Sequence, residues 1–265
     1  MNPPIPEKSS MAEKPAFTQE ATPSYAPFRT SFASLSLHRT DRIRLLQFPP
    51  SDIEAIRGII QRSWSNGIQD QRPYSVSYEF KLYGNPWRGQ GSDAIPARTL
   101  MRDIFAHLFS QGWILHASTD ISKKEFDKDT MLFRKQQTPP PDSEWIAISF
   151  NQSDRLRLIG APQDLRVDMQ NLLRQMRLLQ SEDWKDRRLN AYEFKIYGRP
   201  WFPTGEETMS TRLLLLKMLE VLENRGWSLY ASVDQSNGSE NVSETDSWYC
   251  VRDKSWVQGS TVFHR

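Results

Sequence analysis

Arginine and aspartate side chains recur at matching places in the two halves of the chain. Arg98 and Arg212 each come early in a segment with helical apolar spacing, and Asp120 and Asp234 each follow the next apolar run. An arginine beside a carboxylate can clamp an anionic ligand or orient a reacting group. A pair that only stabilises the fold gives the same pattern. We favour this structural interpretation, because ion-pair networks commonly resemble functional sites.

One asymmetric site between the halves is the alternative arrangement. Such a site would combine residues of both halves in a cleft that binds a small molecule or catalyses a reaction. The candidate binding residues are then Arg88, Arg98, His116, Asp120, Arg212, Tyr230 and Asp234. No residue is assigned a catalytic role.

Metal and nucleophile chemistry have little support in the sequence. The four histidines never fall at ligand spacing with one another or with Cys250, the single cysteine. Nucleotide-binding glycine motifs and the G-x-S-x-G motif are also missing. We therefore expect neither a metal nor a cofactor, and a disulfide framework within one chain is excluded.

A glycine-rich loop from Gly84 to Ser92 could cradle phosphate before a helix. Its counterpart, from Gly198 to Glu207, replaces donors with prolines and adds two glutamates. Both loops keep Gly-x-Pro-Trp, which suits a tight turn with an aromatic plug over the core. We therefore predict that Trp87 and Trp201 are buried, with each indole N–H reaching a carbonyl.

An internal duplication supplies the elements that position these residues. The run from Tyr78 to Trp87, YEFKLYGNPW, returns 114 residues later (192 − 78) as YEFKIYGRPW, and Gly112-Trp113 returns as Gly226-Trp227. The period is longer than that of solenoid repeats, so each copy should be a domain-sized unit. We predict a disordered tail over 1–28 and repeats over 29–143 and 144–265.

Apolar spacing predicts ββαβαββ in each unit. Alternating segments indicate a short-looped hairpin in each copy, and spacings of three and four indicate two helices, the second ending at a glycine. The predicted fold class is α+β, with mainly antiparallel sheets that carry helices on one face. Trp256 to Phe263 is predicted as a further strand. On the polar strand face, Glu79 and Glu193 should form cross-strand charge ladders with nearby arginines.

Composition narrows the classes of partner. The chain has 265 residues and a net charge of +2 from 34 basic and 32 acidic side chains, which argues against nucleic acid and anionic membranes. No membrane span and no secretory signal are recognised, so we expect a cytoplasmic or nuclear location without secretion. The loop over 235–247 is acidic and rich in serine, which suits either a solvated loop or a regulatory contact.

The run YEFK-x-YG-x-PW, followed by a helix and Gly-Trp, resembles runs in an uncharacterised, mainly fungal group of duplicated proteins. The resemblance covers about residues 31–265 and implies the repeated fold alone. No activity and no catalytic residue follow from it.

The residues kept in both copies are mainly Gly, Pro, Trp and core apolar side chains, which maintain the fold. We therefore expect a non-enzymatic protein-interaction or adaptor protein. An enzyme or small-molecule binder with its site between the repeats is the first alternative, and RNA binding on the open sheet face is the second. The sequence does not indicate an oligomeric state.

Overall fold

The computed structural model describes residues 30–88, 91–119, 130–235 and 246–262. The predicted tail over 1–28 and most of the acidic loop over 235–247 lie outside these residues. The first unit consists of β1 (Phe32–His38), β2 (Arg42–Leu46), α1 (Pro50–Ser63), β3 (Ile68–Tyr74), β4 (Ser77–Leu82), α2 (Ala94–Ser110), β5 (Trp113–Thr119) and β6 (Thr130–Lys135). Two short 3-10 turns, Pro86–Arg88 and Gly91–Asp93, lead into α2.

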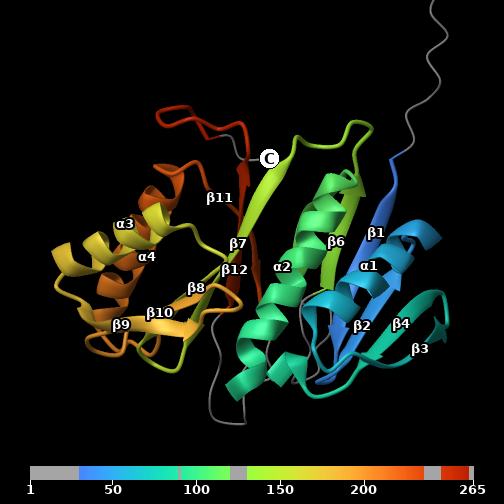
Figure 1. The fold of residues 1–265 in the computed structure, drawn as a ribbon, viewed down its shortest axis with the longest axis horizontal. Coiled ribbons are helices and arrows are strands. Elements are labelled where there is room, and N and C mark those ends of the chain that lie inside the picture. Colours follow the sequence, from blue (N-terminus) through green and yellow to red (C-terminus); the bar gives the residue numbers. More distant parts are fainter. Residues whose placement is uncertain (1–29, 89–90, 120–129, 236–245, 263–265) are drawn as a thin grey trace, which may run out of the picture.

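The second unit repeats this order of elements. It consists of β7 (Ser143–Asn151), β8 (Arg155–Ile159), α3 (Gln163–Gln175), β9 (Leu179–Asp186), β10 (Ala191–Ile196), α4 (Glu207–Glu223), β11 (Ser228–Val233) and β12 (Ser247–Asp253). Figure 1 shows the two units side by side along the colour gradient of the chain.

The two sheets have the same topology. The first sheet has the strand order β3-β4-β2-β1-β6-β5, and the second sheet, read in the matching direction, has β9-β10-β8-β7-β12-β11. All neighbouring strands are antiparallel. The α+β class and the duplication are therefore confirmed.

Each unit contains one more strand than predicted, so the pattern is ββαββαββ instead of ββαβαββ. The added strands, β3 and β9, lie at sheet edges beside β4 and β10. Their side chains are mostly polar and none is fully buried, so the apolar alternation that marks a half-buried strand is missing. Pro73 fits within β3 because an edge strand leaves one row of backbone groups unpaired.

The strand predicted over Trp256 to Phe263 is wrong for the described residues up to 262. Trp256 instead turns back, with its backbone N–H donating to Asp253 O at 3.0 Å. Its indole packs on Gly226, where a Cβ would lie 2.3 Å from a ring carbon. Only glycine fits this position, which also has φ +78°. The chain therefore closes over the end of α4 and adds no strand.

The helices begin and bury their apolar faces as their sequences predict. Pro50 occupies the first turn of α1, where its missing N–H costs nothing, and Asp52 follows in the same turn. Ile56, Ile59 and Ile60 then face the first sheet at 0–4% exposure. In each unit the helices of that unit cover one face of the sheet.

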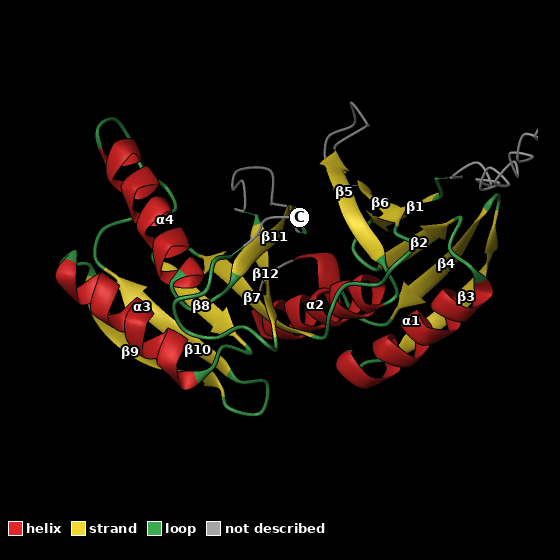
Figure 2. Ribbon diagram, turned by 90° about the horizontal axis from the view of Figure 1, so that it is seen from above, coloured by secondary structure: helices red, strands yellow, loops and turns green. Residues whose placement is uncertain are grey.

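Helix α2 also covers a second surface. It lies between the two sheets, while α3 and α4 lie on the outer side of the second sheet (Figures 1 and 2). The buried cluster of the first unit accordingly includes Ala147, Ala231 and Tyr249 from the second sheet. The two units therefore share one continuous core across α2.

In the part of the chain that the structure describes, every helix is too short or too polar to cross a membrane.

Candidate functional site

The two matched arginines lie in different environments. Arg98 is 2% exposed between α2 and the second sheet, where its Nε donates to Ser247 Oγ at 3.0 Å and its Nη1 to Ala94 O at 2.9 Å. Arg212 is exposed on α4, with its Nη1 3.3 Å from Met209 Sδ. Arg98 therefore joins the two units, whereas its counterpart faces solvent.

His116 and Tyr230 occupy matching β-bulges on the edge strands β5 and β11. These two edges are adjacent, because the Leu115 N–H donates to Tyr230 Oη at 2.7 Å. His116 is exposed and its ring meets Phe32 edge-on, with 5.7 Å between ring centroids. The bulges interrupt both edges and bring the two sheets together at a corner.

The structure describes two of the three remaining candidate residues, Arg88 and Asp234. Arg88 is exposed in the short turn before α2, Asp234 is half-buried just after β11, and Asp120 lies outside the described residues.

Aromatic side chains pack between the units in the region where the alternative site was expected. Phe105 meets Tyr249 at 4.9 Å between ring centroids, and Trp145 meets Tyr230 at the same distance. Phe109 lies 5.5 Å from Tyr230. Burial raises the pKa of the Tyr230 phenol above its ordinary value, so its hydroxyl stays protonated. The hydroxyl oxygen accepts the hydrogen bond from the Leu115 N–H.

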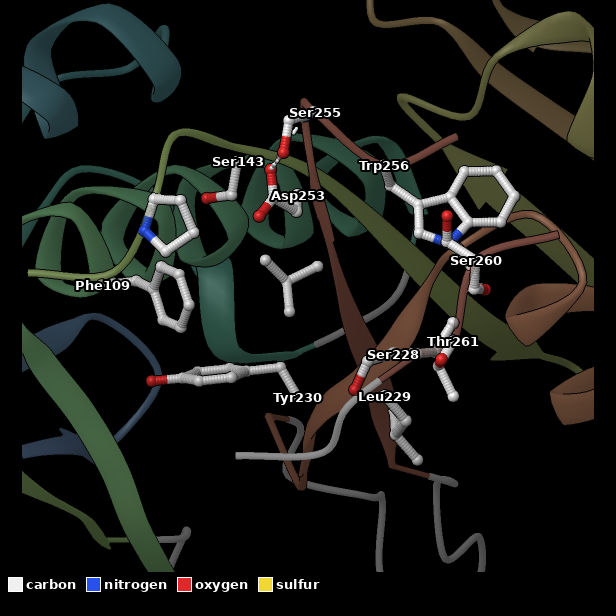
Figure 3. A pocket seen from close by; sticks show the side chains of 14 residues that line it. Phe109, Ser143, Ser228, Leu229, Tyr230, Asp253, Ser255, Trp256, Ser260 and Thr261 are labelled. Atoms are coloured by element: carbon white, nitrogen blue, oxygen red, sulfur yellow. Dashed lines mark hydrogen bonds between the residues drawn. The ribbon is translucent and has the colours of Figure 1, made fainter. Parts of the chain in front are cut away.

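A pocket of about 310 Å³ opens beside this cluster, between the end of α2, β11 and the C-terminal segment (Figure 3). Serine hydroxyls and apolar groups form most of its lining. Tyr230 and Asp253 are the titratable groups among the described lining residues, and Asp253 accepts hydrogen bonds from the Ser255 N–H and Oγ. These residues could hold a small ligand with hydroxyl groups, but they do not provide a paired acid and base.

A charge cluster lies on the face of the first sheet opposite α1 and α2, which we call the open face. Glu79 on β4 is 2% exposed beneath three arginines: Arg42 Nη1 at 2.6 Å, Arg44 Nε at 2.8 Å and Arg72 Nη2 at 3.2 Å. The Arg44 guanidinium also stacks over the Tyr74 ring at 4.0 Å. The charge ladder predicted around Glu79 is therefore confirmed, and Arg42 also lies 3.6 Å from Asp41, so three arginines meet two carboxylates here. The ladder predicted around Glu193 is confirmed by Arg157 Nε, 2.6 Å from its carboxylate.

The charge cluster gives the open face a pH-dependent contribution to stability. Burial acts to raise the pKa of Glu79, but Arg44, Arg42 and Arg72 lower it below its usual value of 4.5 overall. A carboxylate with a lowered folded pKa stabilises the protein above pH 4.5, and this stabilisation is lost as the pH falls through the folded pKa.

We therefore expect Glu79→Gln to flatten the acid side of the stability profile. The free energy of unfolding of the wild type should fall more steeply below pH 4.5 than that of the variant. Urea titrations across this pH range measure both slopes. Equal slopes would show that Glu79 is not held in its ionised form.

The described residues contain no group of three or more His, Cys, Asp or Glu side chains that could hold a metal ion.

Comparison with known proteins adds the family. One domain-family model matches the chain twice, at residues 31–134 and at residues 144–251. The chain belongs to this uncharacterised family. No curated protein and no solved structure gives a significant match. The two matches correspond to the two units, so differences between them are differences between two copies of one family domain.

The two family domains differ in what covers one face of the sheet. Strand pairing places Ser34, Ser36 and His38 of the open face at the positions of Ala147, Ser149 and Asn151 in the second domain. Ala147, Ser149 and Asn151 are buried at 0–9% exposure, since α2 packs along β7, whereas their counterparts are only half-buried. No helix of the described residues packs on the open face.

For helices α2 and α4 the difference is reversed, since the helix of the first domain is the covered one and that of the second domain is exposed. Sequence reasoning missed this difference. In α2, which packs on the second sheet, Ile95 and Thr99 are 7% and 6% exposed, whereas their counterparts in α4, Met209 and Leu213, are 61% and 49% exposed. Leu216 continues this row at 59%. Positions i, i+4 and i+7 form one helical stripe, a signal that was present in the sequence.

Proposed function

We propose that this protein is a non-enzymatic interaction protein whose docking surface is the open face of the first sheet. The observation that carries the proposal is the difference between the two domains. One face of the family sheet receives a helix in the second domain, whereas in the first domain no helix of the described residues covers it. A surface that the same fold uses for helix packing is suited to receive a helix from a partner.

The charges of the open face indicate the chemistry of the partner. Arg42, Arg44 and Arg72 surround one glutamate, and Arg134 lies on the same face opposite Phe32. Small side chains, Ser34 and Ser36, line the middle strand between these groups. The face therefore suits a helix with apolar side chains at its centre and carboxylates at its margins.

Photocrosslinking tests this docking surface. A photoreactive amino acid at Ser34 should crosslink to protein in a native lysate, whereas the same amino acid at Val167, which is 43% exposed on α3, should give little product. Nuclease treatment should leave the Ser34 products intact. Products that disappear with nuclease would indicate RNA instead, and equal labelling at both positions would contradict a specific docking face.

A small-molecule site is supported by one separate observation, the pocket beside Tyr230. Its volume of about 310 Å³ lies at the lower end of the range for ligand pockets. Ligand binding there should raise the melting temperature of the wild type but not that of Ser228→Trp, a substitution that fills the pocket. If a screen finds no ligand that stabilises the wild type in this way, the small-molecule function is not supported and the interaction function stands.

A further inference from the structure

The packing of α2 on the second sheet shows how this fold joins one domain to the next. Arg98 and Phe105 of α2 contact Ser247 and Tyr249 of β12, and Phe109 meets Trp145 of β7 with 5.4 Å between ring centroids. The helix therefore packs its first face on its own sheet and its second face on the sheet of the following domain. We call this packing of a helix on the sheet of the following domain a joint, and the described residues of one molecule contain one, between α2 and the second sheet.

The two halves of a second joint are present and unpartnered within the described residues. The helix half is the stripe of Met209, Leu213 and Leu216 on α4, at 49–61% exposure. The sheet half is the open face, where Ser34 and Leu132 take the positions of Ala147 and Tyr249. An exposed apolar stripe of this kind marks an interaction surface.

We propose that the occupant of the open face is α4 of a second copy of this chain. The α4 stripe of one molecule packs on the first sheet of the next molecule and repeats the joint between α2 and the second sheet. This inference rests on the proposed docking surface and names its partner.

Charge complementarity supports this pairing. Helix α4 and the residue before it carry Glu206, Glu207, Glu220 and Glu223 against Arg212 and Lys217, so the helix is acidic. The open face is basic. The repeat equates Glu223 with Phe109, which contacts Trp145 and Tyr230 in the existing joint.

The counterparts of Trp145 and Tyr230 in the first domain are Phe32 and His116. Glu223 is thereby placed beside His116, and the acidic start of α4 is placed toward the arginine cluster.

The geometry of this contact is head-to-tail. A helix of one molecule meets a sheet of another, so the contact is heterologous and leaves one free helix stripe and one free sheet at the ends of any open assembly. Such contacts either close into a ring or continue into a filament. The wild-type protein should therefore assemble in a concentration-dependent way.

Two variants block the two halves separately. Leu213→Glu combined with Leu216→Glu puts charge into the α4 stripe at exposed positions, so the fold should be retained. Ser34→Arg puts a long charged side chain into the open face. Analytical ultracentrifugation of the full chain should show assembly of the wild type and monomers of each variant. Val167→Glu, a matched apolar-to-acid change on α3, should assemble as the wild type does.

Mixing the two blocked variants is the decisive experiment. Each retains one intact half, so the mixture should form a one-to-one complex that grows no further. Its dissociation constant should match that of the wild-type contact within about tenfold, which corresponds to about 1.4 kcal/mol, because both halves that form the contact are unsubstituted. A symmetric contact between two α4 stripes would give no complex in the mixture, and that result would overturn the inference.

Failure of the inference and failure of the proposed function can be distinguished. A wild-type chain that stays monomeric at all concentrations overturns the self-assembly. If Ser34 still crosslinks to other proteins in the lysate, the docking surface stands with another partner. If neither self-assembly nor protein crosslinks are found at Ser34, both are wrong.

Discussion

Replacing Trp87 by alanine should lower the free energy of unfolding by about 3–5 kcal/mol, the usual cost of removing a large aromatic ring from a core. Trp87 is completely buried and its Nε1 donates to Arg42 O at 3.0 Å. Trp201→Ala should act in the same way, at the lower end of this range because Trp201 is 9% exposed. Its Nε1 donates to Arg155 O at 2.8 Å.

Denaturant titration with a neighbouring control checks this expectation. Phe202→Ala removes an aromatic ring that is 51% exposed next to Trp201, so its midpoint should change little. A midpoint unchanged in both tryptophan variants would show that these indoles do not maintain the core. Loss of partner crosslinking at unchanged stability would instead make them part of a binding surface.

The burial of both tryptophans was predictable because their surroundings recur in the sequence. A glycine, a proline and a tryptophan kept in two copies, with two unrelated sets of residues after them, indicate a role common to both copies. In the structure both indoles donate to the carbonyl of the first residue of a strand, Arg42 or Arg155. Duplication thus served as an internal comparison for fold-maintaining residues.

The edge strands β3 and β9 could not be predicted in this way. Their backbones pair with β4 and β10, but most of their side chains point into solvent on both faces. Hydrophobic periodicity shows which side chains of a strand are buried, and an edge strand of this kind buries too few side chains to give a periodic pattern. Backbone pairing with β4 and β10 and a few polar and aromatic contacts, such as Arg72 with Glu79 and Trp184 with Tyr192, hold these segments in place. Neither kind of contact produces an apolar alternation in the sequence.

The sequence contains a signal of the joint between the domains, which sequence reasoning did not recognise. Leu100, Ile104 and Leu108 form the stripe of α2 that faces its own sheet. Ile95 and Phe109 lie off this stripe and are also buried. Apolar residues around most of a helix indicate contacts on two sides. The space between the repeats, where the alternative interpretation placed a cleft, is therefore largely filled by aromatic rings.

Phe105→Ala should destabilise both domains together, by about 3–5 kcal/mol for a buried phenylalanine. Phe105 is completely buried and lies 6.3 Å from Phe133 in its own domain and 4.9 Å from Tyr249 in the next, between ring centroids. One continuous core crosses the joint, so the loss should be felt on both sides of α2.

Hydrogen exchange followed by mass spectrometry separates a shared loss from a local one. Peptides from β1 in the first domain and β7 in the second should both exchange faster in Phe105→Ala, within a single unfolding transition. The matched control is Leu219→Ala, the equivalent position on α4, which is half-buried and has no second sheet packed on it among the described residues. Its effect should be smaller and confined to the second domain. If Phe105→Ala changed exchange in the first domain alone, the domains would fold independently, and α2 would be a contact between them instead of a part of one core.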